Sequence, residues 1–192
     1  LGSQKLSGTY WQRAYRGRSM VIEKMSLAVI NANSPYEVKV ALADDTLCFI
    51  TDYDAEIFVT FERDDILHNG LVYQFGISNP KGVKSPRDPK VRETILAIVE
   101  EFFAKNNAAF LYICDTSGGM QKMRNRLFKY WFGIYGERKE YVFLPQTITD
   151  EEGNDNYAAL IIRKDNPQFA DLVSEFMATV NLLNTKPEDF DE

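Results

Sequence analysis

The chain has 192 residues, of which 45% are hydrophobic, 26% charged and 13% aromatic, with a formal net charge of -6 and a pI of about 5.0. Its length fits one domain that buries a core without a disulfide or a metal, and its aromatic content excludes a disordered chain. The acidic balance disfavours a general binder of nucleic acids or of anionic membranes.

Two cysteines and one histidine limit the chemistry open to this chain. Cys48 and Cys114 lie in apolar runs, which predicts buried free thiols of an intracellular protein rather than a disulfide. Together with His68 they are too few for a Cys/His zinc site, so we expect no metal. No run reaches the ~18 apolar residues of a membrane span, and Glu23 and Lys24 interrupt the one candidate signal segment. We expect a soluble, cytoplasmic protein.

Residues 1–34 are predicted to form an N-terminal arm or leader that is partly flexible. Up to Arg18 the charged residues are all basic, and glycines break any periodicity. Two explanations stay open: a leader or mobile arm, with Met20 as an alternative start, or an arm that binds an acidic partner. The apolar residues between Ser19 and Asn31 fit a short helix or a strand.

A single domain is expected from residue 35 to residue 183, and it begins with four antiparallel strands. Apolar and polar residues alternate there, with short polar turns between the runs, as in a meander of half-buried strands. The alternation places Val38, Val40 and Leu42 on one face. The expected strands are 36–43, 47–51, 56–62 and 71–78.

Three helices and three further strands are expected after this meander. Asp88 followed by Pro89 is typical of a helix start, and Asn106 ends that helix after Lys105. The run 110–114 is wholly apolar, which predicts a strand covered on both faces. The remaining elements are a helix at 120–135, a hairpin of strands 140–149 and 157–164, a helix opened by Asn166 and Pro167, and an acidic tail at 184–192. The fold class is therefore α+β, with a mostly antiparallel central sheet of about seven strands packed by three helices.

The main candidate site is the polar turn Asp115-Thr-Ser-Gly-Gly between the strand 110–114 and the helix 120–135. The carboxyl end of a buried strand and the amino end of a helix together favour an anion, because backbone N–H groups and a partial positive charge gather there. The helix adds basic residues without any acid. We expect a small polar or anionic ligand, or a protein partner, to contact Asp115, Ser117, Gln121, Arg124 and Arg126. The alternative is that Asp115 or Ser117 only caps the helix while the basic residues form a solvated face.

A second candidate is the basic loop 79–89, which contains Lys81, Lys84 and Arg87. It fits a phosphate site or an exposed, solubilising loop. Gly82 is its only glycine, so the glycine pattern of a phosphate-cradling loop is absent.

The remaining polar residues are expected to have structural roles. His68 lies in a turn beside Asn69 and Gly70, and a single histidine there gives no Ser-His-Asp triad. Six aspartates without the spacing of a metal loop are assigned to solvation and turn chemistry: Asp44, Asp45, Asp52, Asp54, Asp64 and Asp65.

One set of residues around the main candidate site resembles the signature of an uncharacterised bacterial family, a domain of unknown function. The similarity is expected to run from about Pro35 to Phe176. Because that family has no known reaction, the resemblance implies none, but it adds weight to the main candidate site. The signature comprises Cys114-Asp-Thr-Ser, Gln121, Arg124, Arg126, Phe128 and Trp131-Phe132.

The element order ββββαβαββα also resembles the core of the GNAT acyltransferases. In that family the loop after the fourth strand binds the pyrophosphate of acyl-CoA. The resemblance therefore implies an acyl-CoA site at Lys81, Gly82, Lys84 and Arg87.

This chain departs from the GNAT pattern near the helix 120–135. Asn125 and Gly136 match the spacing of that family, but Phe128 stands where a small residue is expected. Phe132 replaces the usual tyrosine acid, and phenylalanine has no proton to give. The resemblance thus implies a GNAT-like fold whose site is altered or lost.

Two functional hypotheses follow. The first is a binding or regulatory module without a cofactor, which uses the site at 114–126. The second is a divergent acyl-CoA-dependent N-acyltransferase, in which Tyr130 or Tyr135 serves as the acid. A third idea, nucleic-acid binding by the basic aromatic helix, conflicts with the acidic total charge.

Overall fold

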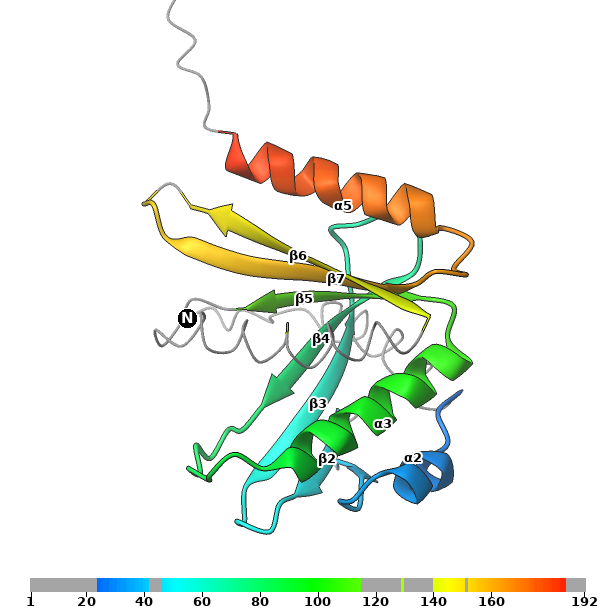
Figure 1. Cartoon of the computed structure of the whole chain (residues 1–192), viewed down its shortest axis with the longest axis vertical. Helices are drawn as coiled ribbons and strands as arrows, with labels where there is room; N and C mark the ends of the chain where they lie inside the picture. The colour runs from blue at the N-terminus through cyan, green and yellow to red at the C-terminus, as the bar shows by residue number, and fades with distance from the viewer. Residues whose placement is uncertain (1–23, 42–45, 115–128, 130–139, 151, 186–192) are drawn as a thin grey trace, which may run out of the picture. The chain divides into compact units, whose positions relative to one another are not determined.

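The computed structural model describes residues 24–41, 46–114, 129, 140–150 and 152–185 (Figure 1). In these ranges it has three helices, α2 (Leu27–Asn33), α3 (Pro89–Lys105) and α5 (Phe169–Asn184). The strands are β1 (Lys39–Val40), β2 (Thr46–Ile50), β3 (Glu56–Arg63), β4 (Val72–Ser78), β5 (Ala109–Cys114), β6 (Tyr141–Thr149) and β7 (Asp155–Arg163). They form one sheet in the order β1-β2-β3-β4-β5-β7-β6. The predicted α+β class with a mostly antiparallel sheet of seven strands is confirmed.

β4 and β5 form a parallel pair, with Val72 opposite Ala109 and Gln74 opposite Leu111. Four other pairs are antiparallel: β1–β2, β2–β3, β5–β7 and β6–β7. A parallel pair requires a crossover connection, and here the chain from β4 to β5 passes through α3. The strands β1 to β7, with α3 after β4 and α5 after β7, occur in the predicted chain order. Of the predicted helix 120–135, residue 129 alone is among the described residues, and it is helical.

The contacts of the chain divide into two interleaved units. The first comprises the described residues up to Arg63 together with Gly76–Asn106, and the second comprises Asp64–Phe75 and the described residues from Asn107 onwards. Each unit has its own core.

The core of the first unit lies between β2, β3 and α3. The alternation predicted from the sequence buries Leu47, Phe49, Val59 and Phe61, with polar or half-buried residues between them. Phe102 of α3 stacks on Phe61 with 5.1 Å between the ring centroids. The predicted helix start is confirmed, since Asp88 caps α3 and Pro89 opens it, and Asn106 caps its end.

The first predicted strand, 36–43, is wrong at its start and in which residues it buries. Lys39 and Val40 are in register with β2, and the N–H of Ala41 donates to the carbonyl of Thr46 (2.8 Å). Val40 is 46% exposed, although Val38 is 1% exposed. The reason is Asn31 of α2, whose side chain accepts from the N–H of Val38 (2.7 Å) and donates to its carbonyl (3.0 Å). These bonds take the place of strand pairing at Val38, so β1 begins at Lys39. Leu42 lies outside the described residues.

The core of the second unit surrounds β5 and β7. Leu111, Leu160 and Ile162 pack with Leu172 and Phe176 of α5 in one buried cluster, and Figure 1 shows α5 lying along β6 and β7. The residues that alternate with them, Phe110 and Ile161, are also fully buried. The prediction that the run 110–114 is covered on both faces is therefore confirmed for residues 110–112, whereas Ile113 is 46% exposed and the side chain of Cys114 is not among those described.

Candidate functional site

The main predicted site lies outside the described residues, but the strand that leads to it is described. These site residues are Asp115, Ser117, Gln121, Arg124 and Arg126. β5 lies between β4 and β7 in the sheet, and its last residue, Cys114, is opposite Tyr157 of β7. Residue 115 therefore follows directly from the carboxyl end of an interior strand, as the sequence predicted.

The basic loop between β4 and α3 begins with a turn and otherwise has no regular secondary structure. The N–H of Gly82 donates to the carbonyl of Asn79 (3.0 Å). Gly82 has a φ of +62°, a left-handed conformation that favours glycine. Of the four residues that the GNAT resemblance assigns to acyl-CoA, Lys81 is paired with Glu56 at 3.0 Å. Gly82, Lys84 and Arg87 are exposed.

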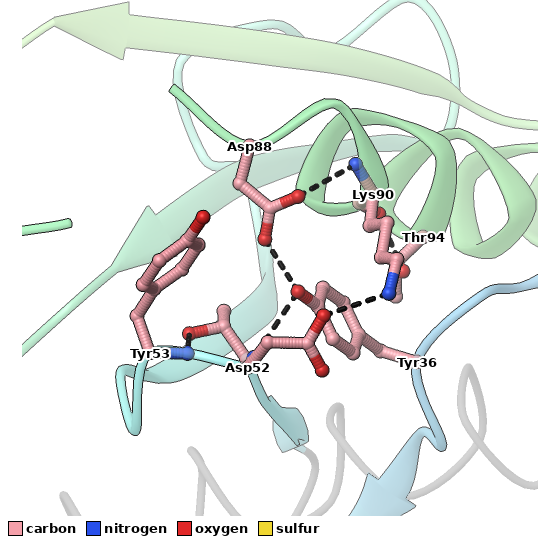
Figure 2. Close-up of polar contacts among 7 residues, drawn as sticks. Tyr36, Asp52, Tyr53, Asp88, Lys90 and Thr94 are labelled. Atoms are coloured by element: carbon pink, nitrogen blue, oxygen red, sulfur yellow. Dashed lines mark hydrogen bonds and ion pairs between the residues drawn. The ribbon is translucent and has the colours of Figure 1, made fainter. Parts of the chain in front are cut away.

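A polar cluster lies where this loop enters α3, and it was not predicted as a site. Figure 2 shows Asp88 and Lys90 from the start of α3, and Asp52 from the turn between β2 and β3, around the hydroxyl of Tyr36. The Tyr36 hydroxyl donates to Oδ2 of Asp88 and accepts from the N–H of Asp52 (3.1 Å). Oδ1 of Asp88 accepts from the N–H of Lys90 (3.0 Å). One phenol thus joins three segments of the first unit.

An ion pair completes this cluster on its exposed side. Lys90 Nζ donates to Oδ2 of Asp52 at 2.7 Å and lies 5.6 Å from the centroid of the Tyr36 ring. The hydrogen bond to Lys90 lowers the pKa of Asp52, and the same bond raises the pKa of Lys90. Burial, aided by the neighbouring carboxylates, raises the pKa of Tyr36. At neutral pH Asp52 is therefore a carboxylate, Lys90 an ammonium and Tyr36 a neutral phenol.

This charge arrangement affects what α3 can bind. A helix N-terminus attracts anions through its free N–H groups and its partial positive charge. At α3 the Asp88 carboxylate already accepts one of these N–H groups and brings a negative charge to the same place. The cluster therefore works as a structural junction, and a further anion at this helix end would meet repulsion from Asp88.

Only part of this junction could be predicted from the sequence. The Asp88-Pro89 pair predicted the cap, and Asp52 was correctly placed in a turn. Nothing in the periodicity linked Tyr36 to Asp88, because 52 positions separate them and the contact depends on tertiary packing.

In the connection between β3 and β4, the structure corrects the role predicted for Asp64. Asp64 was predicted to be solvated, but it is only 3% exposed. Its Oδ2 accepts from the N–H groups of Ile66 (3.1 Å) and Leu67 (2.8 Å), and its Oδ1 accepts from Gln74 (2.9 Å). Its predicted role in shaping a turn is confirmed. Asp44 and Asp45 lie outside the described residues.

His68 in the same connection is exposed, as expected. Its backbone N–H and that of Asn69 donate to the two carboxylate oxygens of Glu175 on α5, at 2.7 Å and 2.9 Å. The histidine position thus takes part in a structural contact through its main chain.

The described residues contain one free thiol and no candidate metal site. Cys48 is a free thiol that is half-buried, rather than fully buried as predicted, and burial raises its pKa. The side chain of Cys114 is not among those described.

Within the described ranges, no three His, Cys, Asp or Glu residues gather into a group suited to a metal ion. In the same ranges, no helix combines the length and apolarity that crossing a bilayer requires.

Comparison with known families gives one match. Residues 87–178 match a family of unknown function (DUF6169), which confirms the resemblance to an uncharacterised family. The match begins at the start of α3, rather than near Pro35, and ends within α5. No curated protein matches the chain.

Proposed function

We propose that this protein is a binding or regulatory module that accepts a small anion, or an anionic group of a protein partner, at the segment that follows β5. The residues assigned to the site are Asp115, Ser117, Gln121, Arg124 and Arg126. The observation that supports this proposal is the position of β5, an interior strand whose carboxyl end leads straight into Asp115. In open α/β sheets, ligands bind outside the carboxyl ends of parallel strands, and β5 is parallel to β4 here.

The charge distribution along the sequence supports the same site. From Gln121 to Tyr135 the chain has four basic residues and no acidic one. Arginine suits an anion in particular, because its planar guanidinium can donate two parallel hydrogen bonds to a carboxylate or a phosphate. The basic loop 79–89 differs, because Lys81 already pairs with Glu56 and Asp88 occupies the adjacent helix end.

Calorimetric titration with inorganic pyrophosphate tests the proposal. We expect binding by the wild-type protein that Arg124→Ala weakens by roughly tenfold or more, since a hydrogen bond to a charged group is lost. Lys84→Ala is the matched control, because it removes a basic residue from the other loop. Absence of binding at millimolar pyrophosphate, or equal weakening by both variants, would contradict an anion site after β5.

A second candidate function is a divergent acyl-CoA-dependent N-acyltransferase. The observation that favours it is the parallel pair of β4 and β5 joined through α3, with the basic loop directly before the helix. Acyl-CoA would then contact Lys81, Gly82, Lys84 and Arg87, and Lys81 would have to leave Glu56.

Titration with acetyl-CoA and with CoA separates the two candidates. Micromolar binding that Lys84→Ala weakens and Arg124→Ala leaves unchanged would make the acyltransferase the leading hypothesis. No detectable binding at millimolar CoA would exclude it in this form.

A further inference from the structure

Among the described residues, β6 is the last strand of the sheet, and its pairing with β7 defines which of its main-chain groups face outward. The register with β7 is uninterrupted along all of β6. Beyond the two ends of this ladder, the N–H of Lys164 donates to the carbonyl of Glu140 (2.8 Å) and the N–H of Asp150 donates to the carbonyl of Asn154 (2.9 Å). Hydrogen-bonded pairs alternate along an antiparallel ladder, so the even-numbered residues of β6 bond to β7. The main-chain groups of the odd-numbered residues therefore point toward the outer edge of the sheet.

Asn184, the last residue of α5, binds two of these outward groups. Its side-chain carbonyl oxygen accepts from the N–H of Thr149 (2.9 Å), and its side-chain N–H donates to the carbonyl of Thr147 (2.9 Å). In parallel pairing, one residue of a strand bonds in this way to two residues of its neighbour that lie two positions apart. The side-chain amide of Asn184 thus occupies the place of one residue of a neighbouring strand.

Pro145 modifies the same edge two residues before Thr147. It lies opposite Ala159 of β7, and the odd-numbered position would direct an N–H outward, but a proline has none. Within sheets, proline is confined largely to edge strands for this reason. Between residues 145 and 149, the outer edge of β6 therefore lacks one N–H and has a second that Asn184 already binds.

The opposite edge of the sheet, which belongs to the first unit, has a similar arrangement. β1 is only two residues long, and directly before it the side chain of Asn31 binds both the N–H (2.7 Å) and the carbonyl (3.0 Å) of Val38. Exposed edges are templates for pairing with another chain, and proteins protect them with short strands, prolines and covering groups. Because a side-chain amide binds the chain at both edges, we interpret these bonds as edge protection.

We propose that Asn184 acts as a surrogate strand residue that closes the outer edge of β6 against pairing with a second copy of this chain. The same edge of two molecules can pair antiparallel about a twofold axis. With the axis at Thr147, the two copies of Thr147 bond to each other, and the N–H of Thr149 meets the carbonyl of Pro145 in the second copy. This pairing needs the Thr147 carbonyl and the Thr149 N–H, which are the two groups that Asn184 binds.

The edge is accessible to such a copy once Asn184 is removed, because Thr147, Thr149 and Asn184 are all exposed. Edge protection therefore depends on two hydrogen bonds at the surface and not on buried packing. The proposal concerns residues that the anion site after β5 does not use, so either can fail without the other.

Sedimentation velocity at several protein concentrations tests the proposal. Asn184→Ala removes both hydrogen bonds and should raise the self-association constant roughly tenfold or more, because two edge groups in each copy gain a new partner on association. Asn181→Ala is the matched control, since Asn181 is an exposed asparagine of the same helix, and it should associate like the wild type. Pro145→Thr restores an outward N–H and should raise association further when it is combined with Asn184→Ala. If Asn184→Ala associates no more than the wild type at any concentration, the proposal is overturned.

Hydrogen exchange separates edge protection from a contact that only anchors α5. In dilute Asn184→Ala, the amide of Thr149 should exchange roughly tenfold faster than in the wild type, because it has lost its acceptor. The amide of Ile148, which faces β7, should keep its rate. At high concentration the Thr149 amide should become protected again, because a carbonyl of the second copy replaces Asn184. A loss of stability without this concentration-dependent protection would mean that Asn184 only anchors the helix.

Discussion

The two long connections on either side of β4 are held in different ways. Residues 64–71, before β4, are held by carboxylates that accept backbone N–H groups, Asp64 from Ile66 and Leu67 and Glu175 from His68 and Asn69. Residues 79–88, after β4, are held by side-chain contacts, the exposed Lys81 paired with Glu56 at one end and Asp88 bonded to the Tyr36 hydroxyl at the other. The first connection also packs on the buried Leu172, whereas most of the second faces solvent.

This difference indicates which connection is free to move. Bonds to the backbone fix the path of the chain, and packing on a buried leucine adds the hydrophobic term. Exposed ion pairs fix only the ends of long side chains and weaken with salt. We therefore expect the connection before β4 to be rigid and the connection after it to be adjustable, and the following experiments test that contrast.

The largest effect is expected from Leu172→Ala in the rigid region. Leu172 is fully buried in the second core, so its truncation should lower the free energy of unfolding by about 2–5 kcal/mol in urea denaturation. Leu182→Ala on the same helix is the control, because Leu182 is 74% exposed and should change stability by less than about 0.5 kcal/mol. Equal effects of the two variants would show that Leu172 does not support the connection.

A smaller loss is expected from Gly70→Ala. An added Cβ would lie 2.8 Å from Cδ1 of Leu172 and 3.2 Å from Cβ of Gln168, which forces a shift in packed surroundings. We expect a loss of about 1–3 kcal/mol. In the double variant Gly70→Ala/Leu172→Ala the clash is relieved, so the combined loss should be smaller than the sum. If the two losses add strictly, the direct packing of residue 70 against residue 172 is contradicted.

Glu175→Ala should act locally on the same connection. Two N–H groups lose a charged acceptor, which should cost about 1–3 kcal/mol and raise hydrogen exchange at His68 and Asn69. Glu175→Gln retains one oxygen acceptor, so its stability should lie between that of the wild type and that of Glu175→Ala. In the wild type, exchange at these two amides should change little with salt, unlike exchange in residues 79–88. A similar salt response in both connections would remove the contrast between them.

Tyr36→Phe should lower the free energy of unfolding by about 1 kcal/mol, because the Asp88 carboxylate and the Asp52 N–H lose their shared partner at the start of α3. The control is Tyr53→Phe, since Tyr53 lies in the adjacent turn and is 47% exposed. Urea denaturation compares the two. No difference between them would mean that the buried phenol adds nothing to the junction.

The smallest effect is expected from pH. Because the pKa of Asp52 is lowered, its contribution is complete above the ordinary aspartate value of about 4 and is lost as pH falls through the lowered value. The pKa of Lys90 is raised, so its contribution is complete below about 10.4 and is lost as pH rises through the raised value. Amide chemical shifts of residues 79–88 should therefore stay constant between about pH 5 and 9. A transition within that window would contradict the assigned charge states.

Much of the fold followed from local patterns in the sequence. Alternation at Leu47–Phe49 and at Ile57–Phe61 predicted β2 and β3, and Asp88 with Pro89 predicted the start of α3. The apolar run 110–114 predicted a strand, and β5 lies there. These features were predictable because strand period, helix caps and turn residues depend on neighbours along the chain.

The rest depended on contacts between residues that are not neighbours along the chain. Asn31 replaces the strand pairing of Val38, Tyr36 reaches Asp88, and Glu175 holds the N–H groups of His68 and Asn69, 106 or more positions away. None of these partners can be read from periodicity, because a polar side chain pairs with whichever group the packed fold brings near it. Local patterns in the sequence were sufficient for the fold class, for β2 to β7 and for both ends of α3. Which carboxylates are buried and which lysines are neutralised depended on the folded structure, because burial and charge pairing are set by distance in space.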